Sequence, residues 1–442
     1  MKTPIYDFLK DYAEGKTARL HMPGHKGAGP LGIEAFDITE ISGADSLFEA
    51  DGIIAESEKN AGAVFGADTF YSAGGSSLSI RAMVYLAALR SGGKKIIAAR
   101  NVHKSFISAV ALLGLDVSWI FGEGEYLSLK ITTRDVERAI EREPDAIAVY
   151  LTAPDYLGGS SDVRAIAEVC HKKGIPLLVD NAHGAYLRFA EGIEHPMESG
   201  ADMCADSAHK TLPVLTGGGY LHINKNDRYG FSQRAREALS LFGSTSPSYL
   251  ILSSLDCFND IADGEYRDAV NSLVKKASII REELRRYGYG VVDSDRCDPL
   301  KITVSPLDLG YSGYGIASLL RERGVECEFC DPEYTVFMLT PSNSDEDIER
   351  LKGALLSIPR RAGLNRPTCS PIKPEVAMSV SAAVLSPFES VNIECAVGRI
   401  LASVSVPCPP AVPILVPGEI VSPEAIEIYK HYGIKRINLV KT

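Results

Sequence analysis

Between Gly66 and Ile223 the chain alternates between short apolar runs and amphipathic stretches, and this alternation restricts the possible folds more than any other feature. The apolar runs have the length of strands and little polar alternation, as expected for strands buried on both faces; they are KKIIAA (94–99), AIAVYL (146–151) and IPLLVD (175–180). The stretch 161–174 has apolar residues at helical spacing, with Ser161 placed to cap its start and Gly174 to end it. Strands that alternate with helices predict an α/β fold with a parallel sheet covered on both faces.

The pattern changes after a long amphipathic stretch at 265–288, which predicts a single helix leading out of the large domain. The order then becomes strand, helix, strand, strand, which indicates a smaller α+β domain; the segments are KITVS, GIASLLRERG, VECEF and YTVFML. We therefore expect an N-terminal arm at 1–50, a large domain at 51–294 and a small domain at 295–442. The proline-rich stretch 358–375 is predicted to be a connection, and 406–419 has too many prolines for a central strand and is expected to wrap over a surface.

Charge and composition exclude several classes of function. The net charge of the 442-residue chain is −11 and no Lys/Arg run stands out, so we expect neither nucleic acid nor a membrane as partner. No apolar run approaches the ~20 residues of a membrane helix, and the charged N-terminus does not resemble a signal peptide, so a soluble cytoplasmic protein is expected. The nine cysteines then predict reduced thiols. Two pairs with metal-like spacing, Cys327 with Cys330 and His21 with His25, lack further ligands, and no metal site is predicted.

Three features follow predicted strands, at the edge where open α/β sheets bind their ligands. The first is SAGGSS (72–77), which precedes a helical pattern. Gly75 would let the backbone approach a ligand, and the helix N-terminus with the hydroxyls of Ser76 and Ser77 would favour a phosphate. An ordinary Gly-Ser cap is the alternative.

The other two features are an acid and an amine. Asp180 ends a buried strand, with His183 three residues later, and Lys210 follows in DSAHK. A helix-capping aspartate and a surface lysine are the simpler explanations for each residue alone. Together with a phosphate turn they match pyridoxal phosphate, in which lysine takes the aldehyde and a carboxylate keeps the ring nitrogen protonated.

With these motifs in place, the sequence resembles the bacterial-type ornithine/lysine/arginine decarboxylases, which use pyridoxal phosphate and have the aspartate-aminotransferase (type I) fold. The resemblance runs nearly end to end, and HMPGHKG with SAHKTL is its most specific part; the other matching stretches are DITEISGADSL, RNVHKSF, DNAHGAY, STSPSY and PCPPAVPILVPGE. It implies a lyase that decarboxylates a basic amino acid, in polyamine biosynthesis, as a homodimer with shared active sites.

The resemblance also implies roles for individual residues. Lys210 would be the Schiff-base lysine, and Asp180 would hold the ring nitrogen. His103 would stack over the pyridine ring, and His183 would lie near the ring and the substrate carboxylate. The phosphate would be bound by a larger group, in which the last two residues reach the neighbouring subunit; it comprises Ser76, Ser77, Ser207, His209, Thr245 and Ser246.

The sequence departs from the family pattern at three places. PDYLG replaces a PTYYG-like stretch, which puts Asp155 where threonine is usual, and the phosphate turn is SAGGSS. The N-terminal receiver-like domain of the longer enzymes is absent from this chain. Asp155 lies just after a predicted strand, so it either binds the distal cation of the substrate or caps the turn. An aminotransferase that uses the same Lys210 and Asp180 is the alternative function, and a non-catalytic homologue is a further one.

Overall fold

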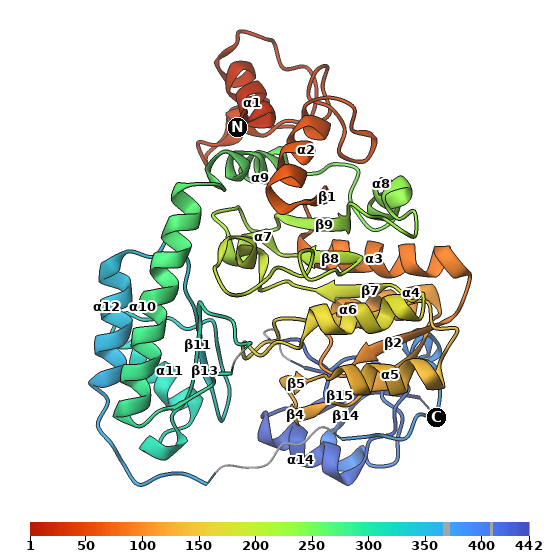
Figure 1. Ribbon diagram of the computed structural model, residues 1–442, viewed down its shortest axis with the longest axis vertical. Coiled ribbons are helices and arrows are strands. Elements are labelled where there is room, and N and C mark those ends of the chain that lie inside the picture. The colour runs from red at the N-terminus through yellow and green to blue at the C-terminus, as the bar shows by residue number, and fades with distance from the viewer. Residues whose placement is uncertain (295, 366–371, 407–409, 442) are drawn as a thin grey trace. The chain divides into compact units, whose positions relative to one another are not determined.

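The alternating apolar runs form the strands of a mixed, mostly parallel sheet in the computed structural model (Figure 1). The structure describes residues 1–294, 296–365, 372–406 and 410–441. The chain divides into two units, one of residues 1–92 with 170–271 and one of 93–169 with 272–442. Four of the seven strands of the sheet belong to the first unit and three to the second. The domain boundaries expected near residues 50 and 294 stay predictions.

The first unit contains strands in the order β1-β9-β8-β7, with helix α3 packed against β7, β8 and β9. β7 and β8 are parallel, whereas β9 runs antiparallel to both β8 and β1. Its elements are α1 (Pro4–Glu14), η1 (Glu34–Phe36), η2 (Leu47–Glu49), α2 (Ile53–Phe65), β1 (Ala67–Ser72), α3 (Gly75–Ser91), β7 (Leu177–Asp180), η3 (Ala185–Phe189), β8 (Met203–Asp206), α7 (Ala208–Thr211), β9 (Gly219–Asn224), η4 (Ser232–Arg234), α8 (Ala235–Ser240) and α9 (Tyr249–Ile261).

The N-terminal helix of this unit is held by a buried carboxylate. Asp256 of α9 accepts hydrogen bonds from the backbone amides of Ile5 and Tyr6, at 2.8 and 3.0 Å. These amides belong to the first turn of α1 and have no partner within the helix. Asp256 therefore caps α1 from another element, which fixes the start of the chain against the unit.

The second unit contributes strands in the order β6-β2-β3 to the large sheet and has a separate antiparallel sheet of order β10-β11-β13-β12. Two smaller pairs, β4 with β5 and β14 with β15, are antiparallel. Its elements are β2 (Lys95–Ala99), α4 (Lys104–Leu113), β3 (Asp116–Ile120), β4 (Glu123–Glu125), β5 (Ser128–Lys130), α5 (Thr133–Arg142), β6 (Val149–Thr152), β10 (Gly290–Val291), β11 (Lys301–Ser305), η5 (Leu307–Leu309), α11 (Gly313–Arg321), β12 (Phe329–Cys330), β13 (Thr335–Met338), α12 (Asp345–Leu356), α13 (Val380–Leu385), β14 (Phe388–Asn392), η6 (Ile393–Cys395), α14 (Pro423–His431) and β15 (Arg436–Val440). Helices α6 (Val163–Lys172) and α10 (Glu265–Tyr287) each contribute residues to both units.

Two local predictions in the second unit differ from the structure, one in full and one in its bounds. Ser161 does not cap α6, because its hydroxyl accepts from the amide of Ile131, and Asp162 instead accepts from the amide of Ala165 at 3.1 Å. The strand predicted in VECEF is shorter and lies further along the chain: β12 covers Phe329–Cys330 and pairs with β13, and the amide of Glu328 also donates to the oxygen of Val336 at 3.0 Å. Short edge strands depend on their partners more than on their own composition.

The proline-rich segment near the C-terminus is a third correction. Residues 410–419 are buried, so the prediction that this segment wraps over a surface is wrong. None of these residues lies in a named strand, as the prolines of the segment predicted. Side chains and backbone groups of the same unit satisfy its carbonyls: Arg100 donates to the oxygen of Ile414 at 3.1 Å, and Tyr126 donates to that of Val412. Irregular backbone can be buried when its polar groups find such partners. Part of this segment, 407–409, and part of the connection predicted at 358–375 lie outside the described residues.

None of the helices in the described ranges has the length and apolar character needed to cross a membrane.

Candidate active site

The three sequence features that suggested a cofactor follow strands that end at one edge of the sheet in the first unit. β1 runs in the same direction as β7 and β8, because β9 is antiparallel to both β1 and β8. β1 ends at the first residue of SAGGSS, β7 ends at Asp180 of DNAHG, and β8 is followed by SAHK. The topology therefore places the glycine-serine turn, the acid and the lysine at the carboxyl edge, where ligands bind in such sheets.

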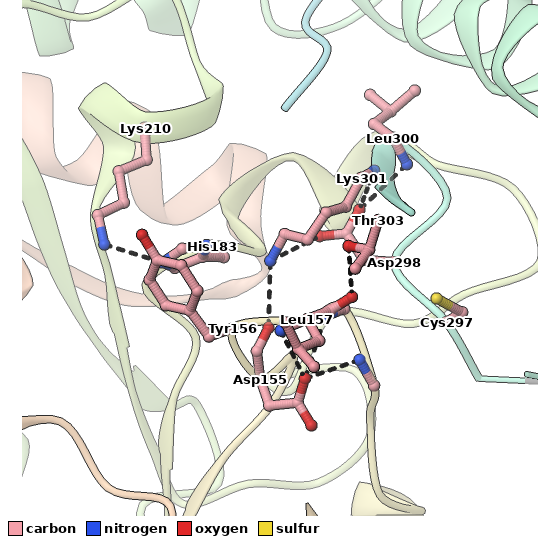
Figure 2. A network of polar contacts seen from close by, with 12 residues as sticks. Asp155, Tyr156, Leu157, His183, Lys210, Cys297, Asp298, Leu300, Lys301 and Thr303 are labelled. Carbon is pink, nitrogen blue, oxygen red and sulfur yellow. Dashed lines mark hydrogen bonds and ion pairs between the residues drawn. The ribbon is translucent and has the colours of Figure 1, made fainter. Parts of the chain in front are cut away.

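Lys210 and His183 form a contacting pair. The Nζ atom of Lys210, on the short helix α7, lies 3.0 Å from Nε2 of His183 (Figure 2). His183 is buried, whereas Lys210 is half-buried although its neighbours Ala208 and Thr211 are buried. The amine thus stays accessible at the edge while its neighbours anchor the helix, and the imidazole is placed to exchange a proton with it.

Asp180 is the last residue of β7 and only 1% exposed. Its Oδ1 atom accepts a hydrogen bond from the amide of Ala182, at 3.2 Å. A buried carboxylate at a strand end requires donors or a cation, since desolvation of the charge is costly. A protonated ring nitrogen would supply such a cation.

The glycine-serine turn and the lysine segment are joined by their serines. The hydroxyl of Ser207 donates to Oγ of Ser76 at 2.7 Å and accepts from the amide of Ser76 at 3.3 Å. Both residues are buried, and Ser77 is half-buried in the same turn. Helix α3 starts here, and its first turn carries no acidic side chain. The turn therefore presents hydroxyls beside a helix N-terminus, an arrangement that favours a phosphate.

Position 75 requires glycine, because its backbone is left-handed and a side chain there would crowd His209. It has a φ of +61°, and a Cβ atom at this position would lie 3.3 Å from Cε1 of His209. A Cβ at Gly219, on the neighbouring strand, would approach the backbone carbon of Gly75 to 2.9 Å. His209 donates from Nδ1 to the oxygen of Gly218 at 2.9 Å, and burial lowers the pKa of its imidazole.

Four other predicted site residues are not part of these contacts. Thr245 and Ser246 lie exposed in the loop between α8 and α9. His103 belongs to the second unit, where it caps α4 by accepting from the amide of Ser105 at 3.1 Å.

Asp155, the fourth, also belongs to the second unit, and its surroundings favour the turn-cap alternative. Its Oδ1 atom accepts from three successive backbone amides at 2.8–3.1 Å, those of Leu157, Gly158 and Gly159 (Figure 2). Its Oδ2 atom accepts from the hydroxyl of Ser128 at 2.7 Å. The side chain is 3% exposed, and burial raises its pKa to about 6 in spite of the Ser128 hydroxyl and the nearby Lys301.

Lys301 reinforces the same turn through the backbone. This lysine is 2% exposed, and its Nζ atom donates to the main-chain oxygen of Asp155 at 3.1 Å and lies 3.7 Å from Oδ2 of Asp298 (Figure 2). A buried ammonium requires such partners. The lysine and Asp155 therefore stabilise one turn between β6 and α6.

Sequence reasoning missed a buried polar cluster in the first unit. Asp206, at the end of β8, contacts His195, His222 and Asn181, and all four side chains are fully buried. The available signal was the occurrence of polar residues inside apolar strands, Asp206 in MCAD and His222 in GYLHIN. Whether these polar residues contact one another depends on which strands are neighbours in the sheet, and the residue pattern of a single strand does not reveal its neighbours.

The fold and the carboxyl-edge residues together define a pyridoxal-phosphate-dependent enzyme of fold type I. The lysine decarboxylase LdcF of Francisella novicida superposes with a TM-score of 0.83, covers 99% of this chain and 81% of its own, and is 17% identical. Lysine decarboxylase A of Pseudomonas aeruginosa also superposes with a TM-score of 0.83, over 99% and 80% of the two chains, at 19% identity. At such identities the likeness establishes the fold.

The sequence comparisons identify the family. Residues 3–307 match the model of the "Orn/Lys/Arg decarboxylase, major domain", and residues 367–434 match its C-terminal domain. The arginine decarboxylase of Bacillus subtilis is 33% identical over 97% of this chain and 94% of its own, and that of Halalkalibacterium halodurans is 32% identical over 95% and 91%. The chain belongs to the Orn/Lys/Arg decarboxylase family and is a pyridoxal-phosphate-dependent amino acid decarboxylase.

The residues of the first unit fit this cofactor. Lys210 offers an accessible amine, Asp180 a buried carboxylate, and Ser76 and Ser207 offer paired hydroxyls at a helix N-terminus where Gly75 leaves room. These are the donors and acceptors that an aldehyde, a protonated ring nitrogen and a phosphate require.

Proposed function

We propose that this enzyme decarboxylates arginine to agmatine and CO2. The observation that carries the chemistry is the 3.0 Å contact between Lys210 Nζ and His183 Nε2 at the carboxyl edge that also holds Asp180. Arginine is favoured over lysine and ornithine because the full-length relatives at 33% and 32% identity are named arginine decarboxylases. The lysine and ornithine decarboxylases of Pseudomonas aeruginosa and Escherichia coli are 23% and 24% identical.

Each residue of the first unit has a distinct task in this proposal. Lys210 would hold the aldehyde of the cofactor, Asp180 its ring nitrogen, and Ser76, Ser77 and Ser207 its phosphate. Pyridoxal phosphate, when bound, supplies an electron sink for the electron pair left at Cα when CO2 departs. Asp180 is buried, so water screens its electrostatic attraction to a neighbouring cation less than it would at the surface.

The last chemical task is the return of a proton to Cα. Lys210 and His183 are hydrogen-bonded, so either group can donate this proton to Cα and then be reprotonated by the other. His209 donates to a backbone oxygen, which orients its ring beside Gly75, so we assign it to the phosphate. His103 is proposed to stack over the ring, as the family resemblance implies.

Release of CO2 measured in parallel with arginine, lysine and ornithine tests the proposal. We expect kcat/KM for arginine to exceed the values for lysine and ornithine by at least about tenfold. A site whose buried hydrogen-bond acceptors pair with a guanidinium leaves some of them unpaired when a shorter ammonium side chain binds. Preference for lysine or ornithine would contradict the choice of substrate. Formation of a keto acid without CO2 would instead indicate an aminotransferase.

We further propose a cytoplasmic homodimer, acting in polyamine biosynthesis, in which Thr245 and Ser246 reach the phosphate bound by the neighbouring subunit. Their exposure in the α8–α9 loop supports this role. The test mixes subunits carrying Lys210→Ala with subunits carrying both Thr245→Ala and Ser246→Ala. A hybrid dimer then has one intact site, so activity should rise on mixing two inactive or impaired proteins. Unchanged activity in a mixture shown to contain hybrid dimers would contradict shared sites.

A further inference from the structure

A buried carboxylate joins the end of β7, which carries Asp180, to the end of β8, which precedes the segment with Lys210. Asp206 is the last residue of β8 and is directly followed by the segment Ser207–Lys210. Its Oδ1 atom accepts from the side-chain amide of Asn181 at 2.8 Å, and Asn181 directly follows Asp180 at the end of β7. The backbone amide of Asn181 also donates to the oxygen of Ala205, at 3.0 Å. One carboxylate and its amide partner thus connect the acid to the lysine segment.

Two imidazoles hold this carboxylate from the other side. Oδ2 of Asp206 lies 2.9 Å from Nε2 of His195 and 3.2 Å from Nε2 of His222. The Nδ1 atom of His195 accepts from the amide of Met197 at 3.3 Å, which orients the ring with Nε2 toward Asp206. The same Nε2 atom lies 3.0 Å from Nδ2 of Asn181, so the imidazole, the amide and the carboxylate are in mutual contact. His222 is oriented by Thr69, whose hydroxyl is 2.9 Å from Nδ1.

The carboxylate is therefore surrounded by donors. The thiol of Cys204 adds one more, 3.3 Å from Oδ1. Burial alone would raise the pKa of Asp206, but His195 and His222 together lower it well below its ordinary value. Asp206 is an ionised group held in the core by hydrogen bonds to charged or polar partners, the condition under which a buried charge is tolerated.

A second aspartate, Asp202, links the same two strands at their opposite ends and also pairs with a histidine, His171 of α6. Asp202, just before β8, accepts from Nε2 of His171 at 3.0 Å and from the amide of Leu177 at 2.8 Å, where β7 begins. This pair shows what an aspartate contributes when it only fastens β7 to β8. It lies at the amino ends of the strands, away from the carboxyl edge, so it serves as a matched control.

We propose that Asp206 is a positioning residue, whose ionised carboxylate locks Asn181 and the two imidazoles so that Asp180 and the Ser207–Lys210 segment meet the cofactor at a set spacing. The inference rests on the proposed function, because it assigns Asp180 and Lys210 to pyridoxal phosphate. Replacement by asparagine would turn an amide donor toward groups that are themselves donors, so the strand ends would separate. The fixed negative charge near Asp180 would also be lost, and with it some preference for a protonated ring nitrogen.

The test compares Asp206→Asn with Asp202→Asn in the full chain, and it measures the Kd for pyridoxal phosphate, the pH dependence of the bound cofactor's visible absorbance, and thermal unfolding of the apoprotein. We expect both variants to lose stability, but only Asp206→Asn to raise the cofactor Kd by about tenfold or more and to shift the absorbance titration. Equal changes in cofactor Kd and titration for the two variants would overturn the proposal, because fastening the strands would then be the whole role of Asp206.

Asn181→Ala provides a second variant in case Asp206→Asn does not fold. It keeps Asp206 with both imidazoles and removes only the link to β7, so it should weaken cofactor binding while an intact His195–Asp206 pair keeps its NMR signals. Wild-type cofactor affinity in Asn181→Ala would contradict the proposed link. A stoichiometric divalent metal in the purified wild-type protein, absent from Asp206→Asn, would replace the proposal with a metal site.

Failure of the proposed function leaves a different signature. A wild-type protein that binds pyridoxal phosphate but releases no CO2 from arginine would contradict the function while the cofactor Kd values still decide the role of Asp206. A wild-type protein that binds no pyridoxal phosphate would overturn both.

Discussion

The Nζ atom of Lys210 lies 3.0 Å from Nε2 of His183; Lys210 is on the short helix α7 that follows β8, and His183 is in the loop that follows the neighbouring parallel strand β7. This contact joins a primary amine to an imidazole at the edge that also carries Asp180. Each member of the group makes a different contribution, which single substitutions can separate.

Lys210→Ala should abolish both CO2 release and covalent retention of the cofactor. In the proposed function this lysine provides the amine that takes the aldehyde, so the variant lacks the group that bonds to the cofactor. Borohydride treatment of protein incubated with pyridoxal phosphate, followed by mass spectrometry, should show cofactor fixed to the wild type and none to the variant. Cofactor fixed to the variant in equal amount would mean that another lysine has this role.

Asp180→Asn should keep cofactor binding but lower kcat by about 10²-fold or more, because the charge that holds the ring nitrogen protonated is lost while the shape is kept. The carboxylate is 1% exposed, so solvent cannot replace it. Steady-state rates combined with the visible absorbance of the bound cofactor check this. A near wild-type rate would show that Asp180 only caps the turn into Ala182.

His183→Gln should lower kcat by about 10²-fold with a small change in KM, since removal of a proton-transfer group slows chemistry more than binding. His171→Gln is a matched control, because His171 pairs with Asp202 at the opposite ends of the same strands. The control should retain activity even if it lowers thermal stability. Equal kcat for the two variants would remove His183 from the chemistry.

Asp155→Asn should leave KM for arginine within about twofold, because four donors already occupy the carboxylate. Its effect on stability should depend on pH. Burial raises the folded-state pKa of Asp155 to about 6, so the native state binds a proton more tightly than the unfolded chain. Wild-type stability is then lost as pH rises from about 4 to about 6, by roughly 3 kcal/mol, whereas the asparagine variant has no such loss.

The free energy of unfolding of wild type and Asp155→Asn, from urea titrations at several pH values, measures this difference. The variant should be most destabilised near pH 4.5 and closest to the wild type near pH 7. A tenfold rise in KM with no pH-dependent difference in stability would restore Asp155 as a substrate-binding group.

Local sequence pattern was sufficient for three strands of the large sheet, of which β7 carries Asp180. β2 and β7 lie within the predicted apolar runs, and β6 overlaps its run and extends to Thr152, because a strand buried on both faces is apolar along most of its length. The same logic located Asp180, because a polar residue at the end of such a strand lies at the carboxyl edge. Lys210 was instead assigned from its place in DSAHK, after the glycine-serine turn and the aspartate. The strand bounds in VECEF and the cap at Ser161 were predicted less well. Each segment had a plausible pattern, but hydrogen-bond partners elsewhere in the fold determined its structure.

The sequence by itself determined the α/β class, because each apolar run and each helical pattern lies within one short segment of the chain. The order of the glycine-serine turn, Asp180 and Lys210 along the chain could also be read from it, and this order predicted the cofactor. Only the tertiary structure decided that Asp155 is enclosed by the amides of its own turn, that residues 410–419 are buried, and that Asp206 joins His195, His222 and Asn181. These outcomes depend on which distant segments supply hydrogen bonds to a buried polar group, and hydrophobic periodicity carries no information about such partners.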